Sequence, residues 1–226
     1  MTRAKCPFAH GIDAFVRESL AARLKEFTKD LHQQAEFHPL QQSIVRGEIS
    51  RADYARFANA MRQIHEAMEA AMAKLAKSDA RVRRLFHDHH RRLHHFDADL
   101  ALLGSVGSAE QIECSIDATE LLGATRFADP LAWLGVFYVL EGSSNGGQAI
   151  TRVLRRAWDL PAVSLRSLDP HGSATRERWQ EFRAGLDACE FSPSERESII
   201  AGASATFRGI VLLMDNYVEA TAASVS

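Results

Sequence analysis

Residues 130–158 place four glycines inside a run whose apolar residues recur at helical spacing. Asp129 and Pro130 supply an N-cap and a first-turn proline where this run begins. Each glycine costs a helix interior about 1 kcal/mol relative to alanine, so helix propensity does not explain the set. The glycines are Gly135, Gly142, Gly146 and Gly147. The sequence therefore predicts a helix in which glycines allow a neighbouring group to approach the backbone closely.

The spacing of these glycines suggests two kinds of neighbour. Gly135, Gly142 and Gly146 share one side of a continuous helix, where another helix or a flat ligand could approach the backbone. A cluster of glycine and serine also permits a kink. Tight helix packing explains any single glycine well. The polar residues 143–145, which stand where a core helix would have leucine, favour ligand contact for the cluster.

Helical periodicity extends over most of the chain, and no run alternates convincingly at period two. Ser50 with Asp53 resembles a capping box, and Ser192, Pro193 and Glu195 form a second helix start. The expected helices cover residues 12–36, 50–77, 79–103, 109–122, 130–158, 174–187 and 192–223. These features predict one all-α domain over residues 12–226, preceded by a mobile N-terminal segment at 1–11.

Composition narrows the functional classes. The 226 residues are 46% hydrophobic and 25% charged with a net charge of −2, so no basic surface indicates nucleic acid or anionic membrane as a partner. Three widely spaced cysteines argue against a disulfide framework. No apolar core of a signal peptide and no stretch of membrane-spanning length is recognised. We expect a cytoplasmic protein.

A histidine near the end of the first expected helix is a candidate metal ligand. Glu36 lies one turn after His32 and could orient its imidazole through the second ring nitrogen. Lys25 lies seven residues before His32, on almost the same azimuth and about 10.5 Å along the helix axis. That span is comparable to the reach from a heme iron to its propionates. A lone histidine on a helix also fits a purely structural role.

A histidine-rich run between residues 87 and 95 offers another possible metal site. His87, His90 and His94 have the spacing that could hold a divalent metal from one helix face. The interleaved Arg91 and Arg92 favour a solvated polar face instead. Other catalytic signatures are missing from the sequence, including Glu-x-x-His, His-Glu-x-x-His, Gly-x-Ser-x-Gly and a phosphate-binding glycine loop.

Two motifs carry a resemblance to a known family. Residues 24–36 read Leu-Lys-Glu-Phe-Thr-Lys-Asp-Leu-His-Gln-Gln-Ala-Glu, and residues 138–148 read Tyr-Val-Leu-Glu-Gly-Ser-Ser-Asn-Gly-Gly-Gln. In order and spacing they resemble the heme oxygenases, particularly the bacterial branch that produces biliverdin, and the resemblance covers nearly the whole chain. It implies a multi-helix fold in which heme lies between a proximal helix and a kinked distal helix.

The resemblance also implies roles for individual residues. His32 would be the axial ligand of the heme iron, with Glu36 beside it. The distal side would be formed by Gly142, Ser143, Asn145 and Gly146. Lys25 and Arg183 would bind the propionates, and Phe207 would line the heme. Phe137 stands where animal enzymes direct a tyrosine toward a propionate.

The activity implied is the opening of heme to biliverdin with release of CO and iron. Heme would be both substrate and cofactor, and O2 the oxidant. Because the sequence has no flavin, nicotinamide or iron–sulfur motif, electrons would come from a ferredoxin, a flavodoxin, a reductase or a small reductant. A protein that accepts biliverdin could be a further partner.

Three positions depart from the family pattern. Ser143 replaces the distal aspartate of animal enzymes, as it does in bacterial relatives. Asn145 replaces an apolar residue, and Trp179 stands where a propionate-side lysine is expected. Two alternatives therefore stay open: a heme-binding protein of the same fold that does not degrade heme, and an enzyme of the wider superfamily with a non-heme metal.

Overall fold

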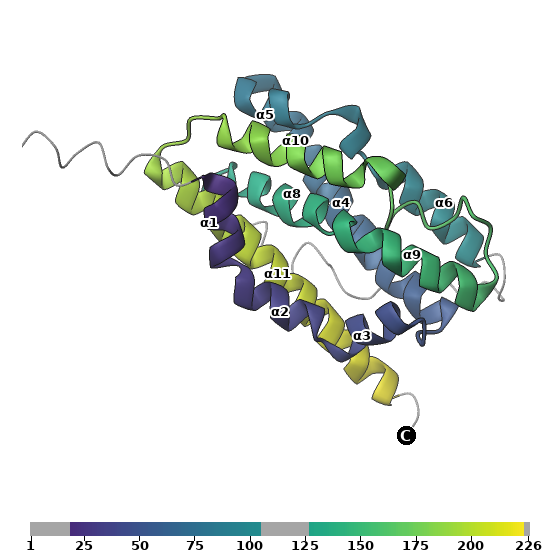
Figure 1. Ribbon diagram of the computed structural model, residues 1–226. Coiled ribbons are helices and arrows are strands. Elements are labelled where there is room, and N and C mark those ends of the chain that lie inside the picture. The colour runs from purple at the N-terminus through teal and green to yellow at the C-terminus, as the bar shows by residue number, and fades with distance from the viewer. Residues whose placement is uncertain (1–18, 105–126, 224–226) are drawn as a thin grey trace, which may run out of the picture.

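The computed structural model describes residues 19–104 and 127–223, and within these ranges all regular structure is helical (Figure 1). This confirms the predicted all-α fold. The elements are α1 (Leu20–Phe27), α2 (Lys29–Glu36), α3 (Pro39–Arg46), α4 (Arg51–Ser78), α5 (Ala80–Leu85), η2 (Asp88–His90), α6 (Leu93–Gly104), α8 (Ala132–Gly142), α9 (Ser144–Trp158), η4 (Gly172–Ala174), α10 (Thr175–Asp187) and α11 (Pro193–Ala223). The expected helix at 109–122 and the segment at 1–11 lie outside the described residues.

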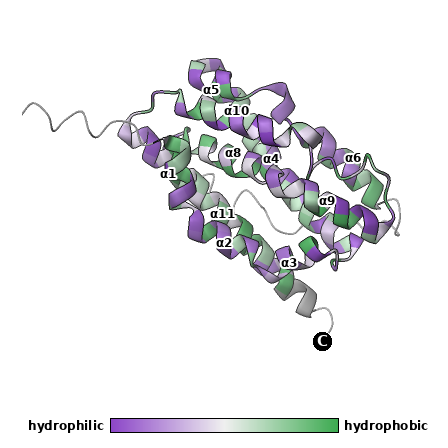
Figure 2. Ribbon diagram, in the orientation of Figure 1, coloured by the Kyte–Doolittle hydropathy of each residue, from purple (hydrophilic) through white to green (hydrophobic). Residues whose placement is uncertain are grey.

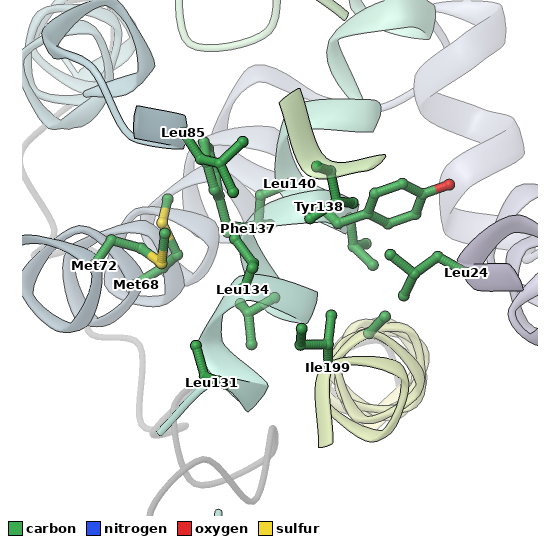
Figure 3. Close-up of a cluster of buried hydrophobic side chains, with 14 of the residues drawn as sticks. Leu24, Met68, Met72, Leu85, Leu131, Leu134, Phe137, Tyr138, Leu140 and Ile199 are labelled. Atoms are coloured by element: carbon green, nitrogen blue, oxygen red, sulfur yellow. The ribbon is translucent and has the colours of Figure 1, made fainter. Parts of the chain in front are cut away.

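Helix α8 forms the centre of the molecule because it is apolar on all sides. Helix α11 packs along it, and α4 packs on it as well. Figure 3 shows Leu134 of α8 lying between Met68 and Met72 of α4 and Ile199 of α11. These side chains are almost entirely shielded from solvent. The hydrophobic effect thus fixes α8 firmly at its N-terminal end.

Two glycines allow α8 and α11 to pack backbone to backbone. A Cβ atom added to Gly135 would lie 1.9 Å from the carbonyl oxygen of Ile199. A Cβ added to Gly202 of α11 would lie 1.9 Å from the carbonyl oxygen of Ala132. No side chain fits at either place. Tight helix packing therefore accounts for Gly135, one member of the predicted glycine stripe.

A second apolar cluster joins α3, the start of α4 and the end of α9. Ile44, Tyr54 and Leu154 are buried in it, and the rings of Tyr54 and Trp158 lie 5.3 Å apart between centroids. This cluster anchors the C-terminal end of α9, while the core described above anchors α8. The turn between α8 and α9 lies between the two anchored regions.

The predicted helix starts at Ser50 and Ser192 are confirmed. The Ser50 side chain accepts a hydrogen bond from the Asp53 amide at 3.1 Å. At the start of α11 the contacts are reciprocal: the Glu195 amide donates to Ser192 Oγ at 3.3 Å, and the Ser192 amide donates to the Glu195 carboxylate at 2.7 Å. Both caps satisfy amides that have no partner within the helix.

The first expected helix is not continuous. Helix α1 ends and α2 begins at Thr28, a buried residue whose hydroxyl donates to the Leu24 carbonyl at 2.7 Å. Lys25 and His32 consequently lie on different helices, so the shared azimuth expected from one straight helix does not apply. The sequence analysis also missed α3, which His38 caps by accepting the Leu40 amide on Nδ1 at 3.1 Å.

The expected helix over residues 79–103 is also wrong in detail. It is divided into α5, η2 and α6, because Phe86 and Arg91 adopt extended backbone conformations. The interruptions turn His90 and Arg92 into the protein, where they are 3% and 2% exposed. The prediction of a solvated polar face therefore fails for these two residues.

Helix α11 contradicts the expectation that no stretch could span a membrane. Its Pro193–Val218 portion has the length and the mean hydropathy, 1.4, required by that criterion. Figure 2 shows α8 and α11 as richer in hydrophobic residues than α2. Helix α11 packs along α8 and also contacts α1 and α2, and this packing explains its apolar composition. A single helix of this kind is weak evidence for a membrane span.

Candidate functional site

His32 presents an accessible imidazole on α2. Its side chain is 60% exposed, and its Nδ1 lies 3.5 Å from a Glu36 carboxylate oxygen one helical turn later. The ring meets Phe207 of α11 edge-on, with 5.7 Å between centroids. Among the described residues, Nε2 has no hydrogen-bond partner. The geometry thus leaves Nε2 available to a metal, with a carboxylate near the opposite nitrogen.

Helix α8 ends at Gly142 and α9 begins at Ser144, so the expected distal helix is interrupted at Ser143, whose backbone stays in the right-handed helical region. The Gly146 amide donates to the Ser143 carbonyl at 3.2 Å, a tighter turn than an α-helix makes. The Asn145 side-chain amide donates to the Gly142 carbonyl at 2.8 Å. Asn145 therefore donates a hydrogen bond to a backbone carbonyl at the point where the helix is interrupted.

The remaining glycines of the cluster have different surroundings. A Cβ added to Gly147 would lie 1.9 Å from the Leu168 carbonyl oxygen, so Gly147 is required by backbone packing. A Cβ added to Gly142 would lie 3.2 Å from the Trp179 indole. At Gly146 no neighbouring atom lies within 4 Å of the added Cβ. Gly146 is therefore the member whose bare backbone faces open space.

Trp179 joins α10 to the turn. Its ring lies 5.2 Å from that of Tyr138, between centroids, and the guanidinium of Arg183 lies 5.8 Å from the Trp179 ring. Arg183 is exposed, as is Lys25 on α1. The indole thus occupies the space that the absent side chain of Gly142 leaves, and it supports one of the two predicted anion-binding cations.

Phe137, which was expected to contact the ligand, is buried instead of exposed. Its ring is 1% exposed and packs edge-on against Phe86, His90 and Phe182 in the core. The other predicted residues present accessible or partly accessible groups: Lys25, His32, Glu36, Gly142, Ser143, Asn145, Gly146, Arg183 and Phe207. Phe137 therefore acts as a core residue behind the turn.

Beneath the turn lies a buried polar network that the sequence analysis missed. Arg92 Nη2 donates to Glu141 Oε2 at 2.7 Å and also to the Ser144 hydroxyl. His171 Nε2 donates to Glu141 Oε1 at 2.8 Å. Burial alone would raise the pKa of Glu141, but the His171 hydrogen bond and the Arg92 charge outweigh it and hold that pKa at about 2. The carboxylate is therefore ionised.

The sequence did contain a signal for this network. Glu141 is the only charged residue in residues 131–142, and a lone carboxylate in a fully apolar helix requires a buried partner. Its partner Arg92 lies within the histidine-rich run, and the sequence analysis assigned that run to a solvated surface. Arg92 reaches Glu141 because the chain is interrupted between η2 and α6, and helical periodicity did not predict this interruption.

The histidine-rich run itself does not form the metal site considered above. No group of three or more His, Cys, Asp or Glu side chains within residues 19–104 and 127–223 is arranged to hold a metal ion. His90 Nδ1 accepts the His87 amide at 3.0 Å, and burial lowers the pKa of His90 to about 3. His90 is therefore a neutral core residue packed on Phe137.

The fold is that of an all-helical protein built around a broken, glycine-containing central helix. Residues 18–214 match the family model of heme oxygenase, and the chain therefore belongs to the heme oxygenase family. This finding confirms the family resemblance seen in the two motifs.

Individual relatives agree with this assignment. A heme oxygenase of Xanthomonas campestris pv. campestris (strain 8004) is 33% identical over 138 residues, which cover 53% of this chain and 79% of the relative. The structure of heme oxygenase from Leptospira interrogans has a TM-score of 0.76 at 24% identity, covering 88% of this chain and 99% of that chain. Heme oxygenase-1 of Synechocystis sp. PCC6803, solved in complex with heme, has a TM-score of 0.76 at 18% identity over 92% and 97% of the two chains.

Proposed function

We propose that this protein binds heme through His32 and opens it to biliverdin, releasing CO and iron. The observation that carries the proposal is the exposed His32 imidazole, whose Nε2 has no partner among the described residues while Glu36 lies beside Nδ1. Membership of the heme oxygenase family and the heme-bound Synechocystis neighbour support the choice of ligand. An imidazole held in this way is suited to axial coordination.

The surrounding residues would orient the ligand. Phe207 would pack against one edge of the macrocycle because it already contacts the His32 ring. Lys25 and Arg183 are exposed cations that can pair with the two propionates. The open side of Gly146 would let heme and O2 approach the α9 backbone without steric conflict.

When bound, heme would supply both the iron and the macrocycle that is oxidised, while O2 and external electrons are consumed. The protein would hold the ring in place and present the polar groups of residues 142–146 on its distal side. The electron donor would be a ferredoxin, a flavodoxin, a reductase or a small reductant, and a second protein could accept biliverdin. We further propose a cytoplasmic location and one domain over residues 12–226.

A second function, heme binding without degradation, is favoured by Trp179. Its indole lies against Gly142, on the turn assigned to the distal side, and could restrict how heme is seated. Asn145 argues less for this alternative because its amide donates to the Gly142 carbonyl within the turn. If Asn145 nevertheless blocked turnover, Asn145→Leu would produce biliverdin faster than the unmodified protein.

The test is a titration with hemin, followed by addition of a reductant under air with catalase present. A Soret band that forms and then decays into the broad red absorption of biliverdin supports the oxygenase. A Soret band that persists under these conditions supports the second function. Failure to form a Soret band contradicts both, and catalase ensures that free peroxide does not destroy the heme.

A further inference from the structure

We propose that Arg92, Glu141 and His171 are positioning residues that fix the turn between α8 and α9 from its buried side. They would thereby set where residues 143–146 stand relative to the bound ligand. The functional half of this inference, that the network sets the position of residues 143–146 relative to the ligand, rests on the proposed binding of heme beside the turn. The structural half, that the network fixes the turn, concerns this chain alone and can be tested without ligand.

The network joins four segments that are distant in sequence. Glu141 lies in the last turn of α8, Ser144 is the first residue of α9, Arg92 precedes α6, and His171 precedes η4. The main chain on either side of Arg92 is also held, because Glu69 of α4 accepts the amides of Arg92 and Leu93 at 2.6 and 3.2 Å. Arg92 is therefore fixed at both its backbone and its guanidinium.

Local side-chain hydrogen bonds at the turn reach only the end of α8, since Ser143 Oγ donates to the Leu140 carbonyl at 2.7 Å and the Asn145 side-chain amide donates to the Gly142 carbonyl at 2.8 Å. Ser143 makes no side-chain cap to α9, and Gly146 has no neighbour that a side chain could contact. Glycine and serine also disfavour helix at this place. The residues alternate in environment: Glu141 and Ser144 are buried, whereas Ser143 and Asn145 are exposed. The hydrogen bonds from Arg92 to Glu141 and Ser144 thus fix the position of the exposed residues 143 and 145, which are adjacent to Ser144 in the chain.

The chemistry of the tether favours positioning over simple stabilisation. A buried arginine–carboxylate pair is frequently no more stabilising than an apolar pair of similar volume, but its geometry is directional. The two carboxylate oxygens of Glu141 have different partners, since Oε2 accepts from Arg92 and Oε1 accepts from His171. This arrangement permits one orientation of the carboxylate and, through Arg92, one position of Ser144.

The decisive experiment compares Glu141→Gln with a matched control, Glu195→Gln. Glu195 also pairs with an arginine, since Arg81 Nη2 donates to it at 2.8 Å, but this pair joins α5 to the start of α11. Both variants exchange a charged partner of arginine for a neutral amide of equal size. Amide hydrogen exchange is measured by mass spectrometry on the heme-free proteins, peptide by peptide.

We expect Glu141→Gln to speed exchange in peptides covering residues 142–148 roughly tenfold or more, while peptides of α11 around Ile199 change little. Glu195→Gln should leave residues 142–148 unchanged. Equal effects of the two variants at the turn, a uniform increase across all helices, or no change at 142–148 would overturn the inference. If Glu141→Gln does not fold, His171→Gln, which keeps the Arg92–Glu141 pair, is judged by the same criterion with a smaller increase.

The functional half is read from the infrared C–O stretch of the ferrous heme–CO complex, which reports polar groups near the bound gas. A single band in the unmodified protein should become shifted or split in Glu141→Gln, and Glu141→Asp should restore it in part, whereas Glu195→Gln should not alter it. An unchanged band in Glu141→Gln would refute the functional half. Failure of the unmodified protein to bind hemin would instead refute the proposed function, while the exchange experiment would still decide the structural half.

Discussion

His32 combines two properties that are rarely found together in a structural histidine. It is largely exposed on α2, yet one ring nitrogen lies near Glu36 and one ring edge meets Phe207. A core histidine is buried and bonded, as His90 is in the same molecule. The contrast between these two residues supports a ligand-binding role for His32 and a packing role for His90.

His32→Ala should abolish axial ligation of heme and leave the fold intact. Because the side chain is exposed, its loss should change the free energy of unfolding by less than about 1 kcal/mol. The Soret band of the hemin complex should shift or weaken, and added imidazole should restore it. His94→Ala, another exposed histidine, is the control and should leave the spectrum unchanged. Identical spectra in the His32 variant and the unmodified protein would exclude His32 as the ligand.

At the residue scale, most residues proposed for the site are exposed, whereas the buried pair of Arg92 and Glu141 was not predicted. Glu36 and Gly146 lie in the two motifs, Arg183 was proposed from the family resemblance, and all three positions are exposed. Phe137 was proposed from its alignment with a family aromatic, which does not reveal that its ring lies in the core and is 1% exposed. Arg92 could not be assigned to Glu141, since the pair is separated by 49 residues and depends on a helix interruption.

Among the elements, the broken helix α8–α9 shows why a glycine cluster has more than one cause. Gly135 and Gly147 admit the backbones of α11 and of the loop at Leu168, whereas Gly146 faces open space. On an ideal helix, Gly135, Gly142 and Gly146 form one stripe, but the turn at Ser143 and the neighbouring helices divide it. Spacing alone therefore predicted a close approach to the backbone, and the structure shows that packing accounts for Gly135, while ligand contact at Gly146 stays a prediction.

Gly135→Ala and Gly146→Ala form a matched pair that separates these causes. The new Cβ at position 135 would meet the Ile199 carbonyl at 1.9 Å, so we expect a loss of about 3 kcal/mol or more in unfolding free energy. At position 146 it meets nothing, and alanine should be neutral or stabilise by up to about 1 kcal/mol. Urea unfolding of the heme-free proteins measures both. Comparable losses at the two positions would contradict this division.

The sequence predicted where most helices lie, but it did not predict the points at which two of them are interrupted. Apolar periodicity continues through Thr28, and residues 86–92 contain no proline or glycine that would end a helix, so both regions were expected to be helical. Thr28 is buried with its hydroxyl bonded to the preceding turn, and Arg92 is drawn inward by Glu141. The Thr28 hydrogen bond is local, whereas the interruption near Arg92 involves a contact with Glu141, 49 positions along the chain. A contact over that separation is invisible to a window of neighbouring residues.

At the scale of the molecule, the network of Arg92, Glu141 and His171 places an ionised carboxylate in the buried interior. Glu141 and Arg92 are each 2% exposed, and the depressed pKa of Glu141 links this network to stability. Because the pKa is lower in the folded protein than in the unfolded chain, the carboxylate stabilises the fold above about pH 4.5. That contribution, roughly 3 kcal/mol, is lost as pH falls toward 2.

Unfolding free energies at pH 7 and pH 3 should therefore reveal the Glu141 charge. The difference between the unmodified protein and Glu141→Gln should be smaller at pH 3 by roughly 2 kcal/mol, because most of the carboxylate contribution has been lost there. Glu66→Gln, which changes an exposed partner of Arg62, should have an effect below about 1 kcal/mol at either pH. A pH-independent difference for Glu141→Gln would contradict an ionised buried carboxylate.

A protein that opens heme releases CO, whereas a protein that only holds heme does not, so CO release distinguishes the two proposed functions. The purified protein loaded with hemin is given a reductant and air in a sealed vial in the presence of catalase. CO in the headspace is measured by gas chromatography while heme loss is followed at the Soret band. We predict CO in an amount equal to the heme consumed, with biliverdin as the coloured product. Persistent heme without CO, or heme loss without matching CO and biliverdin, would contradict the proposed function.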